Sequence, residues 1–221
     1  MNTAYQTRPI RVVRHVGWWL FFLACVFYGI YALVMGVTEI LHLLGIVDDA
    51  KTRAAPFVFV VHALSGSVAL ISGPLQFNRL LRNKNRNLHR IIGRLYVWAI
   101  WLASVSALWS ALFFNVTIAA KIAFGTLAIL WFSTTTVAYL RIRHRKIREH
   151  REWMIRSFAL SLFFVTFNFW MPGLAGTNLP QAVAYPLSVF LSWFLNLVVA
   201  ELWIRHTRTS VSERELPQLH G

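Results

Sequence analysis

The chain has 221 residues, of which 57% are hydrophobic and 14% are charged, and it carries a formal net charge of +14. Soluble domains average about 45–50% apolar and about 25% charged residues, so this composition excludes an ordinary water-soluble fold. The single cysteine, Cys25, excludes an internal disulfide and a CxxC pair for metal or redox chemistry.

Long stretches without charge predict the membrane spans. Four such stretches precede residue 141, and each is long enough for one crossing, which takes about 20 mostly apolar residues. A fifth follows Arg156 and is interrupted at 171–181 by two Pro and two Gly residues, so it predicts two crossings joined by a turn. We therefore predict six spans, near residues 16–37, 57–77, 91–113, 119–140, 154–171 and 182–204.

The basic residues predict how these spans are oriented. If the amino terminus is cytoplasmic, all of the 22 Lys and Arg residues except Lys51, Arg53 and Lys121 fall on the cytoplasmic side. This asymmetry follows the positive-inside rule, so the basic excess reflects topology and indicates no nucleic-acid partner. We predict a multi-pass protein of the bacterial inner membrane with both termini in the cytoplasm. Its expected partners are the lipid bilayer and anionic headgroups.

The fold class that follows is all-α, a polytopic transmembrane helix bundle with six spans. No connection is long enough to fold separately, so one bundle domain is expected over residues 1–205. Residues 206–221 read HTRTSVSERELPQLHG and are predicted to form a polar, disordered cytoplasmic tail.

Two similar segments indicate a weak internal repeat. HRIIGR begins at His89 and HREWMIR begins at His150, 61 residues later, and each follows an arginine-rich loop and opens an outward-running span. Spans two and three then correspond to spans four and five, as in parallel repeats related by an axis along the membrane normal. This arrangement allows His89 and His150 to face one another.

The two histidines are candidate axial ligands, and hence metal ligands, of a b-type haem. Small residues at helical spacing from them, such as Gly93, make room for a flat cofactor or for another helix. The alternative is that both histidines cap helix starts and bind phosphate at the headgroup level. Covalent haem attachment is excluded, because no CxxCH motif is present. Four neighbouring arginines are expected to neutralise the haem propionates: Arg90, Arg94, Arg151 and Arg156.

His62 is a separate candidate cofactor ligand in the second span, where an ionisable side chain is costly. Its helical face carries small residues that form a groove, namely Ser65, Gly66, Ala69, Ser72 and Gly73. One interpretation is a second haem or a metal site with outer partners His42, Glu39, Asp48 or Asp49. The other is a structural histidine that is hydrogen-bonded, with Asn168 as the expected partner. Glu201 precedes Arg205 by four residues, which predicts a local ion pair.

Three runs in this order resemble a family of predicted bacterial membrane proteins catalogued as a domain of unknown function, DUF2306. They are HALSGSVALISGPLQF from His62, LHRIIGRLYV from Leu88 and HREWMIRSFAL from His150. The resemblance covers roughly residues 57–170 and implies a multi-span inner-membrane protein, without an activity or a cofactor. LHRIIGRL is also similar to histidine-glycine patterns in b-type transmembrane cytochromes and ferric-reductase-like bundles.

Three functional hypotheses follow. The first is a haem-linked electron-transfer protein that uses His89 and His150 and has a redox partner. The second is a small solute transporter or lipid-binding protein in which the His62 groove and the Asn168 face line a path. The third is a structural subunit whose small-residue faces dock a partner helix. No motif of soluble-type catalysis is present, so the sequence leaves an enzymatic role undecided.

Overall fold

The computed structural model describes residues 7–47, 55–114 and 116–215. Every regular element in these ranges is an α-helix, which confirms the predicted fold class. Six segments are long and apolar enough to span a membrane, with α6 and α7 together forming the fifth. The helices are α1 (Thr7–Leu43), α2 (Pro56–Gln76), α3 (Arg79–Lys84), α4 (Arg86–Phe113), α5 (Ile118–Arg143), α6 (Ile147–Ser161), α7 (Phe163–Ala175) and α8 (Gln181–Glu215).

Local sequence signals set the ends of several helices. Pro56 opens α2 at the first helical position, where its missing N–H costs nothing. Asn85 and Thr117 cap α4 and α5, because their side-chain oxygens accept hydrogen bonds from the backbone N–H groups three residues later. After α1, Gly45 adopts a positive φ of 69°, which glycine tolerates.

The fifth span is broken at Leu162, where one unbroken crossing over 154–171 was predicted. Leu162 ends α6 and precedes α7, although neither Pro nor Gly is nearby. Hydroxyl groups bond to the backbone on both sides of this break. Ser161 Oγ donates to the Ser157 carbonyl at 3.1 Å, and Thr166 Oγ1 donates to the Leu162 carbonyl at 3.1 Å. Such side-chain bonds to carbonyls of the preceding turn bend helices.

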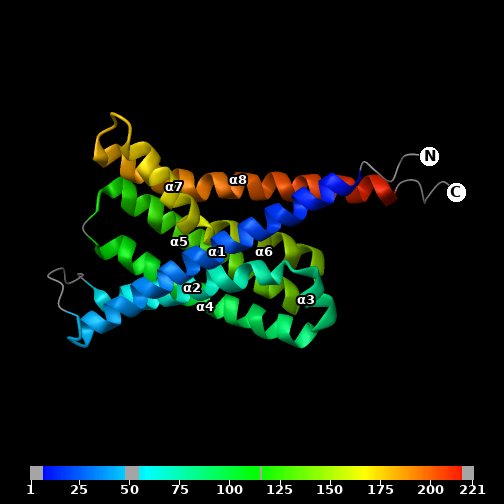
Figure 1. Ribbon diagram of the computed structural model, residues 1–221, viewed down its shortest axis with the longest axis horizontal. Coiled ribbons are helices and arrows are strands. Elements are labelled where there is room, and N and C mark those ends of the chain that lie inside the picture. The colour runs from blue at the N-terminus through cyan, green and yellow to red at the C-terminus, as the bar shows by residue number, and fades with distance from the viewer. Residues whose placement is uncertain (1–6, 48–54, 115, 216–221) are drawn as a thin grey trace.

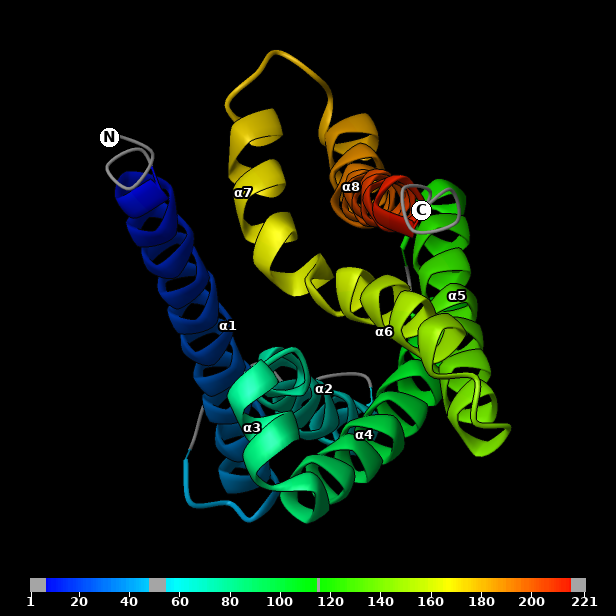
Figure 2. The same cartoon turned by 90° about the vertical axis from the view of Figure 1, so that its right-hand side faces the viewer.

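Four of the segments form a ring of packed helices (Figures 1 and 2). In this ring α2 packs on α4, α4 on α5, α5 on α6, and α6 on α2. Helices α4 and α6 therefore lie diagonally opposite, and none of their Cα atoms approach within 8 Å. Outside the ring, α1 packs mainly on α2, and α8 packs on α5, α6 and α7. Side chains that point into the ring from α4 and α6 must meet across its centre.

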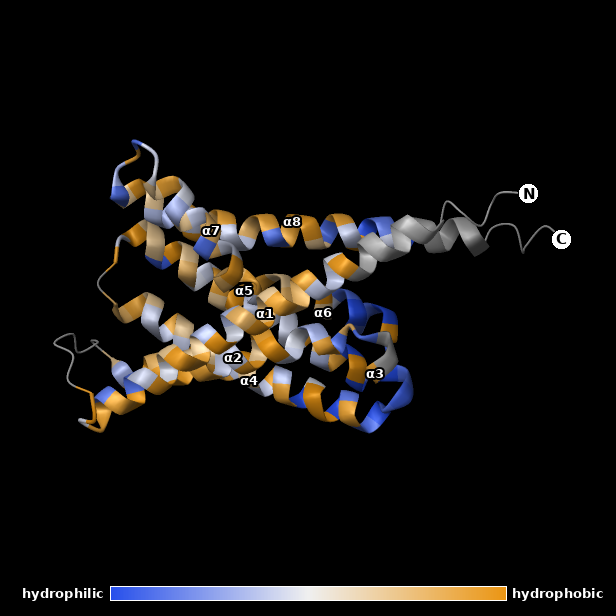
Figure 3. Cartoon of the chain, viewed as in Figure 1, coloured by the Kyte–Doolittle hydropathy of each residue, from blue (hydrophilic) through white to orange (hydrophobic). Residues whose placement is uncertain are grey.

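The surface of the bundle is apolar around its middle, as expected for contact with lipid tails (Figure 3). Exposed aromatic and aliphatic side chains such as Phe27, Trp98 and Val199 lie on this surface. The buried core is rich in small residues and closely packed, and Tyr96, Ile100 and Leu160 are among its fully buried members.

Charged residues gather at one end of the bundle, here called the basic end. It comprises residues 79–94, 141–156 and 201–208, and it lies to the right in Figures 1 and 3. The ends of α1, α4 and α7 and the starts of α2, α5 and α8 lie at the opposite end. All described cytoplasmic segments of the predicted topology thus share one end, although the side of the membrane it faces stays a prediction.

Part of the segment that was predicted to be a disordered tail belongs to helix α8. Helix α8 continues past residue 205 to Glu215, and residues 216–221 lie outside the described residues. The helix is tied to the bundle beyond residue 205, because Arg208 donates to Glu152 on α6. A local reading of polarity did not reveal this long-range ion pair.

Candidate functional site

The structure brings His89 and His150 to the same end of the bundle from diagonally opposite helices. His89 lies in the first turn of α4, and His150 lies in the first turn of α6. Their imidazoles are close enough to interact electrostatically, although 61 residues separate them in sequence. This agrees with the repeat that the sequence predicted, in which the two histidines occupy equivalent positions.

Hydrogen bonding distinguishes the two rings. His150 Nδ1 lies 2.8 Å from the Ala138 carbonyl on α5. Because a carbonyl only accepts, Nδ1 carries the hydrogen, and in the neutral ring Nε2 keeps its lone pair. His89 Nδ1 is buried and has no hydrogen-bond partner among the described residues. The His150 ring is therefore held by a hydrogen bond from its Nδ1, which is typical of a metal-ligating histidine. The His89 ring lacks such a bond among the described residues.

The four arginines that were expected to neutralise the haem propionates differ in exposure and pairing. Arg90 and Arg94 on α4 and Arg151 on α6 have exposed side chains. Arg156 is already engaged, because it makes a two-pronged ion pair with Glu201 on α8 and lies 4.6 Å from the centre of the Trp153 ring.

A cation that the sequence analysis missed also acts on this site. Arg82 on α3 interacts electrostatically with His89, as Arg90 does. Arg82 lies seven residues before His89 on a separate short helix, so no periodicity within one helix connects the two. The arginine-rich loop was visible in the sequence, but its fold over the start of α4 was not.

Two crossed ion pairs join α6 to α8 at the basic end. Glu152 accepts hydrogen bonds from Arg208, and Arg156 donates to Glu201. The sequence predicted a local ion pair of Glu201 with Arg205, and the structure shows that Glu201 also has a partner on another span, Arg156. The guanidinium and carboxylate groups match in geometry in both pairs, so they fix the orientation of α8 on α6.

A network of buried hydroxyl groups lies about two helical turns deeper than the histidines. Tyr96 Oη on α4 lies 3.0 Å from Ser157 Oγ and 3.2 Å from Ser161 Oγ on α6. Ser157 Oγ lies 2.7 Å from Thr135 Oγ1 on α5, and Trp131 Nε1 donates to Ser161 Oγ at 3.0 Å. The connection runs between three helices, so no pattern within one helix reveals it. Tyr96 and Ser157 are again 61 residues apart, like the two histidines.

His62 lies near the opposite end of the bundle and does not join this site. Its Nδ1 lies 2.9 Å from the Ala103 carbonyl on α4, which confirms a hydrogen-bonded histidine. The expected partner was wrong, because Asn168 donates to Phe164 within its own helix. His42 contacts the Val47 carbonyl, and Asp48 and Asp49 lie outside the described residues. No group of three or more metal-binding side chains occurs in the described part of the chain.

Side chains occupy the glycine faces that were expected to make room. A Cβ atom on Gly73 would lie 2.1 Å from Phe158, so the ring of Phe158 fills the groove on α2. At the level of the histidines, a Cβ atom on Gly93 would lie 3.1 Å from Gln76 Oε1. His89 and His150 offer imidazole nitrogens, a donor type that haem iron accepts. The Gln76 amide that lies against Gly93 is the end of a flexible side chain, which can move aside.

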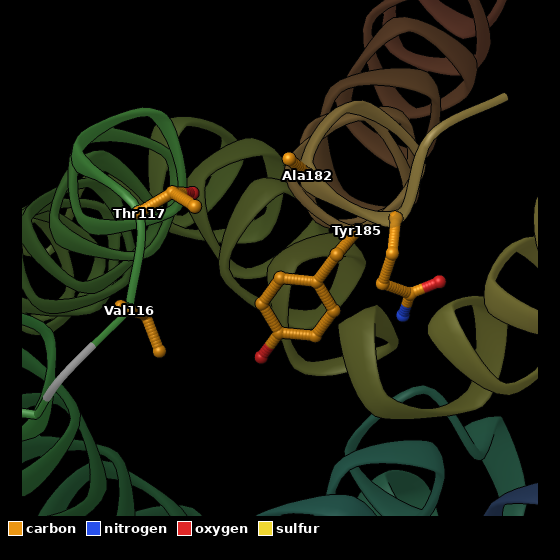
Figure 4. A pocket seen from close by; sticks show the side chains of 5 residues that line it. Val116, Thr117, Ala182 and Tyr185 are labelled. Carbon is orange, nitrogen blue, oxygen red and sulfur yellow. The ribbon is translucent and has the colours of Figure 1, made fainter.

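A second concave region lies at the opposite end and is shown in Figure 4. It is an open hollow of about 450 Å³ between the starts of α5 and α8. The ring of Tyr185 points into it, and its other lining residues are Val116, Thr117, Gln181 and Ala182. It contains no charged side chain and is separate from the histidine site.

Comparisons with known proteins give one match. A family model described as "Predicted membrane protein (DUF2306)" matches residues 59–204, which include all three candidate histidines and the Arg156–Glu201 ion pair. No curated protein and no solved structure matches the chain.

Proposed function

The chain belongs to the DUF2306 family of predicted membrane proteins, and we propose that it is an electron-transfer protein that binds haem b between His89 and His150. One observation carries this proposal: His89 and His150 lie in the first turns of diagonally opposite helices, at the same end of a helix ring. Four-helix bundles build cofactor sites in this way, from side chains on facing helices.

The residues of the chain have defined parts in this proposal. The Ala138 carbonyl holds the His150 ring and leaves Nε2 free to bind iron. Arg90, Arg94 and Arg151 carry positive charge next to the two histidines, where it offsets the charge of carboxylate side groups. The buried layer around Tyr96 excludes water from the bundle centre. When bound, the haem supplies a centre that accepts and releases single electrons.

The test is an absorption spectrum of the full-length protein, expressed with ample haem and measured oxidised and after dithionite reduction. We expect a Soret band and a reduced α band in the wild type, and loss of both in His150→Ala and in His89→Ala. His62→Ala is the matched control and is expected to keep the bands, because His62 bonds to a carbonyl at the far end. A wild-type protein without either band would remove the proposal.

A second candidate is a small-solute transporter, favoured by the break in the fifth span. Transporters often carry interrupted helices whose freed backbone groups face a polar path. Here the break at Leu162 adjoins Ser161, and Asn196 Nδ2 on α8 donates to Thr166 Oγ1 at 3.1 Å. This candidate predicts solute uptake in vesicles that falls in Thr166→Val, and no visible colour. Equal uptake by wild-type and empty vesicles would exclude it.

The membrane and the orientation belong to the same proposal. We place the protein in a bacterial inner membrane with the basic end in the cytoplasm, since the positive-inside rule concentrates Arg and Lys there. Tags fused after Lys84 and after Arg145 are expected to be inaccessible in intact cells, whereas a tag after Gly176 is expected to be accessible. A reversed result for the three tags would contradict this orientation.

A further inference from the structure

The two histidines of the basic end differ in one respect that the haem proposal does not explain. His150 Nδ1 has a protein acceptor at 2.8 Å, the Ala138 carbonyl. His89 Nδ1 is buried but finds no acceptor among the described residues. Buried polar groups in proteins nearly always have a partner, and an exception calls for a missing one.

A second orphaned donor lies close by. Gln76 is the last residue of α2, and its side chain lies over Gly93, one helical turn from His89 on α4. Gln76 Nε2 is buried and also lacks a partner among the described residues. An amide nitrogen only donates hydrogen bonds, and a histidine Nδ1 donates when it carries the ring hydrogen. With that tautomer of His89, both unpaired atoms are donors that require an acceptor. Leaving such donors unsatisfied costs about 1–3 kcal/mol each.

The charge near Gln76 Nε2 and His89 Nδ1 is positive. Arg82 and Arg90 both act electrostatically on His89. The carboxylates of the basic end with described side chains are engaged elsewhere: Glu149 pairs with Arg141 and Lys146, Glu152 with Arg148 and Arg208, and Glu201 with Arg156. None of these carboxylates serves the two donors, and the positive charge around them favours an anion from outside the chain.

We propose that Gln76 Nε2 and His89 Nδ1 donate to a bound phosphate group, whose charge Arg82 and Arg90 balance. Phosphate suits the site because its several acceptor oxygens can serve donors from three helices at once. The site lies where a span ends, at the level of lipid headgroups, so the group belongs either to an anionic phospholipid or to free phosphate. The proposal is independent of haem. If haem is present, the phosphate is also the partner that orients the His89 ring.

The experiment uses delipidated full-length protein in a nonionic detergent and measures the shift in thermal unfolding. One arm adds inorganic phosphate against chloride at equal ionic strength. The other adds phosphatidylglycerol against phosphatidylcholine in mixed micelles. We expect Gln76→Leu and Arg82→Gln each to raise the apparent Kd about tenfold or more, as loss of a charge-assisted hydrogen bond does.

Each variant has a matched control. Gln181→Leu removes the same amide at the opposite end, and Lys84→Gln removes one positive charge from the same short helix as Arg82. Both controls are expected to bind as the wild type does. Arg82 is exposed, so Arg82→Gln keeps the test valid even if Gln76→Leu fails to fold.

The outcomes distinguish a lipid headgroup from free phosphate, and they test the phosphate site separately from the haem proposal. Stabilisation by phosphatidylglycerol alone identifies a lipid headgroup, and stabilisation by inorganic phosphate identifies a free anion. The site is refuted if phosphate stabilises no more than chloride and phosphatidylglycerol no more than phosphatidylcholine. It is also refuted if Gln76→Leu and Arg82→Gln bind as tightly as the controls. An absorption spectrum of the same sample reports haem separately, so binding without haem overturns only the electron-transfer proposal.

Discussion

Replacing Tyr96 by Phe tests whether α4 and α6 are joined across the helix ring. The direction of the hydrogen bonds follows from the backbone. Thr135 Oγ1 donates to the Trp131 carbonyl at 2.8 Å, so Ser157 must donate to Thr135 and Tyr96 must donate to Ser157. Ser161 donates to the Ser157 carbonyl, so the phenol hydrogen is shared between two serine oxygens. Tyr96→Phe removes that hydrogen from fully buried surroundings.

The expected loss is about 1–2 kcal/mol in the free energy of unfolding. An orphaned buried group costs about 1–3 kcal/mol, whereas hydrogen bonds between membrane helices average about 0.6 kcal/mol and reach about 1.7. The assay is unfolding by SDS in mixed micelles, with Tyr31→Phe as the control because Tyr31 is largely exposed. A double-mutant cycle with Ser157→Ala isolates the pair. Additive effects of Tyr96→Phe and Ser157→Ala would refute the connection.

Two further predictions concern packing and charge. Gly73→Ala should lower the free energy of unfolding by about 1–3 kcal/mol, because its new methyl group would lie 2.1 Å from Phe158. Adding Phe158→Leu should relieve most of that loss. Equal melting of Gly73→Ala and the wild type would contradict this packing. Arg156→Glu should destabilise by about 2 kcal/mol by losing charged hydrogen bonds to Glu201. Combining it with Glu201→Arg should restore most of the stability, and failure of that rescue in the same unfolding assay would contradict the pair.

The parts of the fold that depend on composition were predictable from the sequence. Uncharged segments between charged clusters gave the six spans, because burying charge in lipid is costly. The shared spacing of HRIIGR and HREWMIR gave the relation between His89 and His150, and Tyr96 and Ser157 repeat it at the same offset. Periodic and compositional signals of this kind are local, so one sequence is enough to read them.

The features that depend on packing between spans were not predictable. The partner of His62 is a backbone carbonyl, which no side-chain pattern reveals. The ion pair of Glu201 with Arg156 joins two spans, and no spacing within one helix reveals it. The glycine faces are filled by Phe158 and Gln76 from neighbouring helices. The break at Leu162 has neither the Pro nor the Gly that usually marks one, so the sequence does not reveal it.

The claim that His89 and His150 meet across the ring has one direct test. In a Cys25→Ala background, His89→Cys with His150→Cys is treated with dibromobimane, which fluoresces when it links two nearby thiols. The control pair is His62→Cys with His89→Cys, because His62 contacts Ala103, which lies about 21 Å along α4 from His89. The structure predicts strong fluorescence and an intramolecular link for the first pair alone. Labelling of the first pair no greater than that of the control would contradict it.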